Sequence, residues 1–234
     1  MKVHLIQDAI HSFLERQSGA DAPDWRYPHS MIQTFQKQWE DPPGDTLATV
    51  YDLCLKSTYT QRWWKREHYR PKEIMLQLIG ANTELAIVAW KDLFNEDADL
   101  EGRLGRFSFY CDELLKILRA GNVRTVEAHH HQDAAIVSLY LAGRYPDQYT
   151  LYPGLSVFQQ FCKAIGSPEI PPVDDLVRYR KVAKVVHTFL QKDERYNRVV
   201  DQRERTGQGV ILYPFQMSYE VITFEAERFK QKQP

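Results

Sequence analysis

Apolar residues recur at spacings of three and four along most of this chain, which is the period of amphipathic helices. Helices are expected at 3–17, 31–39, 46–54, 71–80, 83–94, 107–118, 136–141, 157–165 and 174–190. Proline and glycine clusters separate several of these segments, as at Asp41–Gly44. The pattern predicts a mainly α protein, an irregular bundle of about nine or ten helices. The run VILYPF, from Val210, allows one short strand near the C-terminus.

The clearest packing pattern lies in the segment from Asp174 to Leu190. Its apolar positions alternate spacings of three and four, which predicts a seam against another helix: Leu176, Tyr179, Ala183, Val186 and Leu190. The proline-bearing stretch Ser167–Pro172 is the best internal boundary. We therefore predict a helical core domain at 1–166, C-terminal helices packing on it at 173–205, and a tail or linker toward a missing downstream domain at 206–234.

Composition narrows the class of protein. The chain has 234 residues, 43% of them hydrophobic, which is enough for a sizeable core. The 30 basic and 31 acidic residues give a net charge of −1, so any nucleic-acid binding must come from local patches. The 3 cysteines form no CxxC pair, and no apolar run is long enough for a signal peptide or a bilayer span. A cytoplasmic protein with reduced thiols and no membrane partner is expected.

The sequence carries no convincing catalytic signature. No phosphate-binding loop of the GxxxxGK[ST] type occurs, and Thr206–Gly209 lacks the following lysine and the preceding strand. Cys111 with Asp112 could be imagined as a nucleophile and its partner. However, Cys111 falls on an apolar helix face, where burial raises the pKa of a thiol and makes it inert. We expect the chain not to be an enzyme and to need no cofactor.

The cluster His129-His130-His131-Gln132-Asp133 is the candidate for a metal site. In a helix only His129 and Asp133 would share a face, and no second His/Asp pair lies nearby. A catalytic reading would require His129, His131 and Asp133 to converge with another acid. A solvated loop or helix start, with Asp133 serving the first turn, is the favoured interpretation, and no metal is expected.

A basic and aromatic run is more informative. Positions 62–72 hold five basic residues and one acid, a local net charge of +4, with aromatic residues interleaved. Basic groups hold phosphates and aromatic faces stack on bases, so the run has the composition of a nucleic-acid contact. A tryptophan pair anchored in the core, with its charged neighbours solvated, is the alternative. The candidate binding residues are Arg62, Trp63, Trp64, Lys65, Arg66, Tyr69 and Arg70.

Charge is also segregated elsewhere. Nine basic residues and four acids lie between Arg178 and Arg205, a net of +5, and Lys181, Lys184, Thr188 and Gln191 fall opposite the apolar seam. Lys181 and Lys184 could extend a phosphate-binding track, or the stripe could be an ordinary solvated face. Between Lys91 and Glu101, five acids face one lysine, a net of −4. An acidic surface opposite a basic one suits a protein partner or contacts between copies.

Four phrases carry a family resemblance: WWKREHYRPKEIMLQLI from Trp63, WKDLFNEDADLEGRLGRFSFYCDELL from Trp90, SLYLAGRYPDQYTLYP from Ser138 and VAKVVHTFLQKDE from Val182. Together they span roughly Thr58 to Glu194, and they resemble the N-terminal region of McrB-like AAA+ GTPase subunits of modification-dependent restriction systems. The resemblance implies a DNA- or target-recognition region that precedes a GTPase motor domain and works with a McrC-like nuclease. The family's known base readers contain strands, so no base-flipping pocket carries over to this helical sequence.

Two hypotheses follow. The first is a non-catalytic DNA-recognition module of a McrB-like restriction and antiviral defence protein. The second is a protein-interaction or oligomerisation domain that senses a phage component or docks on partner subunits without binding DNA, which the balanced net charge favours.

Overall fold

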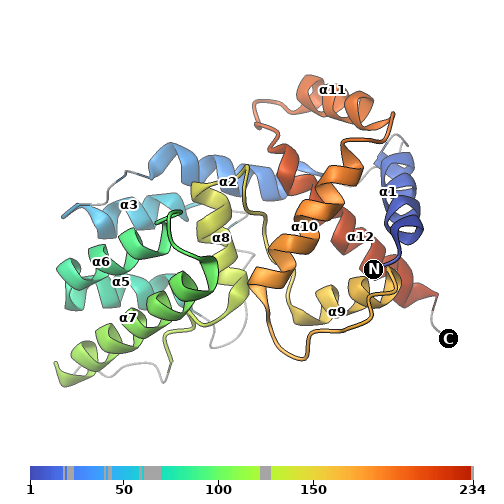
Figure 1. Ribbon diagram of the computed structural model, residues 1–234. Helices are drawn as coiled ribbons and strands as arrows, with labels where there is room; N and C mark the ends of the chain where they lie inside the picture. Colours follow the sequence, from blue (N-terminus) through green and yellow to red (C-terminus); the bar gives the residue numbers. More distant parts are fainter. Residues whose placement is uncertain are drawn as a thin grey trace. The chain divides into compact units, whose positions relative to one another are not determined.

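The computed structural model describes residues 1–17, 19, 24–39, 41, 44–57, 60, 70–121 and 128–232. Within these ranges the chain forms eleven α-helices, one short 3-10 helix and no β-strand (Figure 1). The prediction of a mainly α protein is confirmed, although the expected number of helices was slightly low. The strand allowed at VILYPF is not supported, because residues 210–213 join no ladder and Pro214–Gln216 form the 3-10 helix η1. No described helix is both long and apolar enough to traverse a bilayer.

The chain divides into two compact units. Unit 1 comprises residues 1–29 and 145–234, and unit 2 comprises residues 30–144. The Ser167–Pro172 stretch lies within unit 1, between α9 and α10. A compact unit is not by itself an independently folding domain, so the domain division predicted from the sequence stays a prediction.

Unit 1 is built from helices of both ends of the chain: α1 (Val3–Gln17), α9 (Leu155–Ala164), α10 (Leu176–Leu190), α11 (Tyr196–Thr206) and α12 (Met217–Gln231), with the start of α2 (Arg26–Gln38). Helix α12 packs against α9, α10 and α1 (Figure 1). The seam predicted for α10 is buried at every one of its five positions. Its polar stripe is exposed, so the periodicity identified both faces of this helix.

An aromatic group fixes α10 against the connection before α9. The rings of Tyr152 and Phe158 meet that of Tyr179 edge to face at 5.0 and 5.2 Å. The Tyr179 hydroxyl donates to the carbonyl of Leu151 at 2.6 Å. The side-chain Oε1 of the buried Gln216 accepts from the Leu151 amide at 3.1 Å, so this extended backbone amide is satisfied without a sheet.

Residues 206–234, expected from the sequence to be a tail or linker, contain helix α12. Its Met217, Val221, Ile222 and Ala226 follow helical spacing and are buried. The polar residues between them dominate the composition and hide this apolar stripe. The segment therefore contributes to the core of unit 1.

Unit 2 contains most of α2, with α3 (Leu47–Cys54), α5 (Pro71–Ala81), α6 (Thr83–Leu93), α7 (Leu100–Ala120) and α8 (Ala134–Arg144). Side chains cap two of these helices: Asn82 accepts from the Leu85 amide at 2.9 Å, and Asp99 accepts from the Gly102 amide at 2.8 Å. Trp90 of α6 is fully buried at the centre, where α6 packs on α7. Its ring lies 4.7 Å from that of Tyr140 and 5.4 Å from that of Phe107. This aromatic group organises the core of unit 2.

Candidate functional site

The basic and aromatic run predicted to contact nucleic acid falls largely outside the described residues, which exclude 61–69 and with them Arg62, Trp63, Trp64, Lys65, Arg66 and Tyr69. Arg70 is described and exposed, and its Nε lies 3.9 Å from the Glu73 carboxylate. The Lys72 ammonium binds the Asp52 carboxylate at 2.8 Å. In the described end of the run, Arg70 is therefore exposed and Lys72 forms an ion pair with Asp52.

On α10 both lysines singled out in the sequence are exposed, together with Thr188 and Gln191. Lys181 and Lys184 are one helical turn apart, so their side chains project from the same side of the helix. The buried seam occupies the opposite side. Both lysines therefore lie on the exposed surface of unit 1.

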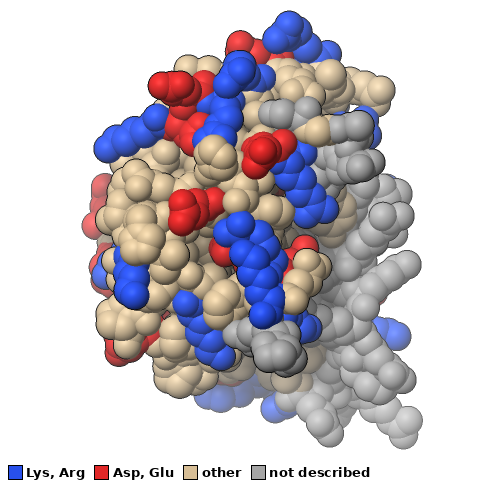
Figure 2. Space-filling view, turned by 90° about the vertical axis from the view of Figure 1, so that its right-hand side faces the viewer, with Lys and Arg blue, Asp and Glu red and all other residues tan. Residues whose placement is uncertain are grey.

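The arginines of the same stretch are less available than the sequence suggested. Ion pairs hold three of them: Arg178 with Glu169 at 3.4 Å, Arg195 with Asp193 at 2.7 Å, and Arg203 with Glu220 at 2.7 Å. Exposed cations and exposed acids alternate on α11 and just before it: Lys192, Glu194, Arg198, Asp201, Glu204 and Arg205. Figure 2 shows Lys and Arg interleaved with Asp and Glu on the face over α1, α11 and α12. The net of +5 thus overstates the accessible positive charge.

The acidic stretch of unit 2 is also partly neutralised within its own unit. Asp92 binds the Arg106 guanidinium at 2.8 Å, and Glu96 binds that of Arg103 at 2.5 Å. Asp99 caps α7. These acids stabilise the junction of α6 and α7, so the sequence count of five overstates the free negative charge on this surface.

The histidine cluster differs from its expected form. His129 and His131 are 2% and 1% exposed, so this is not a solvated loop. As expected, Asp133 serves the first turn of α8, accepting from the Ala135 amide at 2.7 Å. His130, between the two buried histidines, has a φ of 62°, in the left-handed region that histidine tolerates better than most residues. This turn directs both neighbouring imidazoles into unit 2.

The buried imidazoles belong to a hydrogen-bonded chain. His129 Nε2 donates to Asp112 at 3.1 Å, because its Nδ1 accepts from the His131 amide at 2.9 Å. His131 Nδ1 donates to the His129 carbonyl, which leaves its Nε2 to accept from the Tyr140 hydroxyl at 3.0 Å. Tyr140 in turn accepts from the Tyr51 hydroxyl at 2.7 Å. All four ring nitrogens therefore have protein partners.

The same histidines form a geometric metal-ligand group with Cys111, since one ligand atom from each lies within 4.8 Å of the others. A metal would have to displace protein hydrogen bonds from both rings and take a thiolate. Burial raises the pKa of the Cys111 thiol well above its usual range and lowers that of His131 to about 3. A neutral thiol and two satisfied imidazoles favour a structural role for this cluster.

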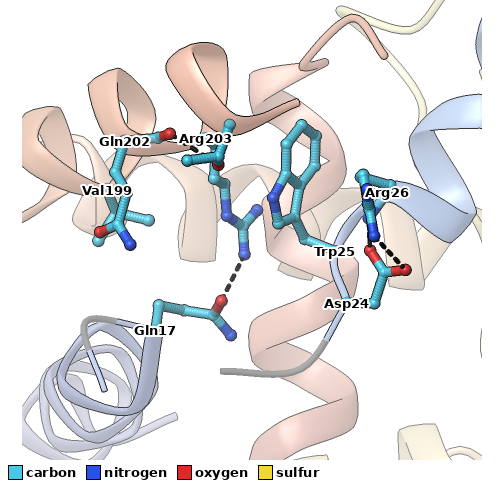
Figure 3. A pocket seen from close by; sticks show the side chains of 8 residues that line it. Gln17, Asp24, Trp25, Arg26, Val199, Gln202 and Arg203 are labelled. Atoms are coloured by element: carbon cyan, nitrogen blue, oxygen red, sulfur yellow. Dashed lines mark hydrogen bonds and ion pairs between the residues drawn. The ribbon is translucent and has the colours of Figure 1, made fainter. Parts of the chain in front are cut away.

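Unit 1 contains a buried charged cluster that the sequence did not single out. Arg203 is 3% exposed and donates from both terminal nitrogens to the two Glu220 oxygens, at 3.0 and 2.7 Å. It also donates to Gln17 of α1 at 3.0 Å, and its guanidinium lies 5.3 Å from the centre of the Trp25 ring (Figure 3). Arg203 lies at helical spacing from Tyr196 and Val199, the apolar face of α11, and that spacing was the available signal for its burial.

His29 completes this cluster. Its Nδ1 accepts from the Tyr213 amide at 2.9 Å, so its Nε2 donates to Glu220 at 3.1 Å. Burial lowers the pKa of His29, although Glu220 acts in the opposite direction. Burial raises the pKa of Glu220, but Arg203 and His29 together outweigh burial, so the pKa is lowered from its usual value. The cluster is thus a neutral imidazole beside a neutralised ion pair.

Two adjoining pockets flank the cluster in unit 1. One, of about 300 Å³, lies between α1 and α11 and is lined by Arg203, Val199 and Gln202 among others (Figure 3). The other, of about 400 Å³, lies between α1, residues 24–28 and α12. Gln17, Asp24 and Trp25 line both.

Comparison with protein-family models, with curated proteins and with solved structures finds no match to this chain.

Proposed function

We propose that this chain is a non-catalytic recognition module of a McrB-like restriction and defence protein, and that it binds DNA in the cytoplasm. The family resemblance of four sequence phrases supports the restriction context. In that context the module would act with a GTPase motor domain and a McrC-like nuclease.

The observation that carries the DNA proposal is the exposed stripe of α10. Lys181 and Lys184 project from one side of a helix whose other side is buried, so they can contact phosphates without disturbing the core. Phosphate contacts give sequence-independent affinity and position the protein on the nucleic acid. Arg70 and the basic, aromatic run before it would supply further phosphate contacts and stacking on exposed bases.

Fluorescence anisotropy with single-stranded and duplex DNA, methylated and unmodified, at two salt concentrations tests this proposal. The dissociation constant should rise steeply with salt, because each phosphate contact releases counterions. A preference for one modified duplex would identify the target. Absence of binding at low salt would overturn the proposal.

Charge-matched variants locate the contact. Lys181→Gln with Lys184→Gln should weaken binding and lower the salt dependence by about two phosphate contacts. Lys56→Gln with Lys91→Gln removes the same charge from exposed positions of unit 2 and should leave binding unchanged. An equal loss in both pairs would indicate non-specific attraction and contradict the α10 contact.

An exposed apolar pair favours the second candidate function, protein interaction. Phe109 and Ile117 of α7 are 57% and 39% exposed, and they lie eight residues apart on one helix face. Large exposed apolar side chains on one face are typical of interaction surfaces. Sedimentation velocity of the wild type and of Phe109→Ser tests for self-association through this face. A monomer in both cases would exclude self-association there.

A further inference from the structure

Aromatic rings line the pocket of about 400 Å³ beside Trp25 in unit 1. Its walls come from α1, residues 24–28 and α12, and they include Phe13, Trp25, Tyr27, Tyr219 and Phe224. All but Phe13 are only partly buried, so the rings keep surface toward the pocket. The volume of about 400 Å³ suits a small group or one side chain of a partner.

Carboxylates outnumber cations on the same walls. Asp24, Glu220 and Glu227 line the pocket, whereas Arg16 is the one cationic side chain among the described residues that line it. Asp24 and Glu220 also bind Arg26 and Arg203, which lie outside this lining, and Glu227 is exposed on α12. Because those two acids are paired, the Glu227 carboxylate and the negative faces of the aromatic rings are the groups of the wall that can attract a cation.

The Tyr219 hydroxyl reports the same polarity. Burial raises the pKa of Tyr219 above its usual range, and Tyr27, Glu220 and Glu227 raise it further. Burial disfavours a charge of either sign at this wall, whereas the nearby acids disfavour only a negative one.

The protein already places its own cations on two of these rings. The Arg16 guanidinium lies 5.5 Å from the centre of the Phe224 ring, and that of Arg203 lies 5.3 Å from the centre of the Trp25 ring. Both distances are within the range of cation–π attraction. The rings can therefore receive a cation, and Arg16 is exposed and able to move aside.

We propose that this pocket binds an organic cation, an ammonium group carried on an alkyl chain. The aromatic walls hold the alkyl and ammonium carbons, and the exposed Glu227 carboxylate neutralises the charge. The site is separate from the proposed DNA contact, because the described residues that line it lie on α1, residues 24–28 and α12 and not on α10. The same chemistry is presented by a free quaternary amine and by a lysine side chain of a protein.

Choline and 3,3-dimethylbutan-1-ol, its uncharged analogue of the same shape, are the probes. Each is titrated into the ¹⁵N-labelled protein, and the amide and indole N–H resonances are followed. Choline should shift resonances of residues 13–17, 24–28 and 219–227, and the neutral analogue should bind about tenfold more weakly or not at all. No saturable shifts with choline, or equal affinity for both probes, would overturn the proposal.

Two exposed residues test the charge dependence with opposite signs. Glu227→Gln should weaken choline binding about threefold to tenfold, whereas Arg16→Gln should strengthen it by removing a competing cation. Glu204→Gln, an exposed acid on α11 outside the pocket lining, is the matched control and should have no effect. If neither Glu227→Gln nor Arg16→Gln changes the affinity, charge does not govern the site and the assignment fails.

Peptides distinguish the source of the cation. A blocked Gly-Lys-Gly peptide and its trimethyl-lysine form are titrated in the same way, with a norleucine peptide as the neutral reference. Tighter binding of a lysine peptide than of choline identifies a protein ligand, and the reverse identifies a free amine. Both outcomes support a cation site, whereas equal binding of the norleucine peptide contradicts it.

Discussion

Arg203 and Glu220 form an end-on ion pair in unit 1, with both terminal nitrogens of the arginine on the two carboxylate oxygens at 3.0 and 2.7 Å. The two side chains are only 3% and 11% exposed. Both charges are removed from water, so each would be strongly unfavourable in this place if the oppositely charged partner were absent. The pair joins α11 to α12, and Gln17 ties α1 to the same guanidinium.

Arg203→Ala should therefore lower the free energy of unfolding by about 3–5 kcal/mol, since it leaves Glu220 buried without its partner. Arg205→Ala, an exposed arginine two residues along α11, should change it by less than about 0.5 kcal/mol. Urea unfolding followed by circular dichroism measures both. If the two substitutions lowered the free energy of unfolding by similar amounts, the burial of Arg203 would not account for its contribution to stability.

Two glycines in helices of unit 2 should respond in opposite directions to alanine. A Cβ at Gly143 would lie 2.5 Å from the Phe35 ring, so Gly143→Ala should destabilise by about 1–3 kcal/mol through overpacking. A Cβ at Gly105 of α7 meets nothing within 4 Å, so Gly105→Ala should stabilise by about 0.5–1 kcal/mol. The midpoints of urea unfolding report the sign of each. Destabilisation by Gly105→Ala would show that helix propensity does not decide the outcome there.

The helical class and the two faces of α10 could be predicted because apolar spacing within one segment determines which side is buried. The buried seam and the exposed Lys181 and Lys184 both follow from that spacing. The pairing of Arg203 could not be predicted in this way. Its partner Glu220 is 17 residues away on another helix, and counting charges within a segment does not find such a contact.

The histidine cluster illustrates a second limit. His129 and His131 are polar residues in an irregular segment, which favours a solvated interpretation. Their burial depends on Asp112 and Tyr140, partners from α7 and α8 that local pattern does not bring together. The pocket beside Trp25 has the same origin, since its walls come from α1, residues 24–28 and α12. Sites assembled from distant segments required the structure.

The three cysteines, Cys54, Cys111 and Cys162, should be unreactive in the folded protein. All are buried, and burial raises the pKa of the Cys54 thiol to about 12. Because the thiolate is the reactive form, Ellman's reagent should modify none of them until the protein is denatured, when all should react. Ser156→Cys adds a thiol at an exposed position of α9 and should react at once. Rapid reaction of the wild type would contradict the burial.

Stability should fall as the pH is lowered below the usual histidine range. Burial is the largest cause that lowers the pKa of four histidines, His29, His129, His131 and His187. Each binds a proton less readily in the folded state than in the unfolded state, whose pKa is about 6.5. Their contribution is therefore fully present above about pH 6.5 and is lost as the pH falls through the folded values, toward about 3 for His131.

His131 can be isolated by substitution, because His131→Gln removes the titrating ring and retains an acceptor for the Tyr140 hydroxyl. The free energy of unfolding is measured in urea between about pH 7 and pH 5, where most carboxylates stay ionised. The wild type should lose up to about 1.4 kcal/mol per pH unit for each proton that only the unfolded state binds, and the variant should lose less. The exposed His4→Gln substitution provides the matched control. If the stability of His131→Gln has the same pH dependence as that of the wild type, His131 binds its proton equally well in the folded and unfolded states. Its burial beside Tyr140 then does not lower its pKa.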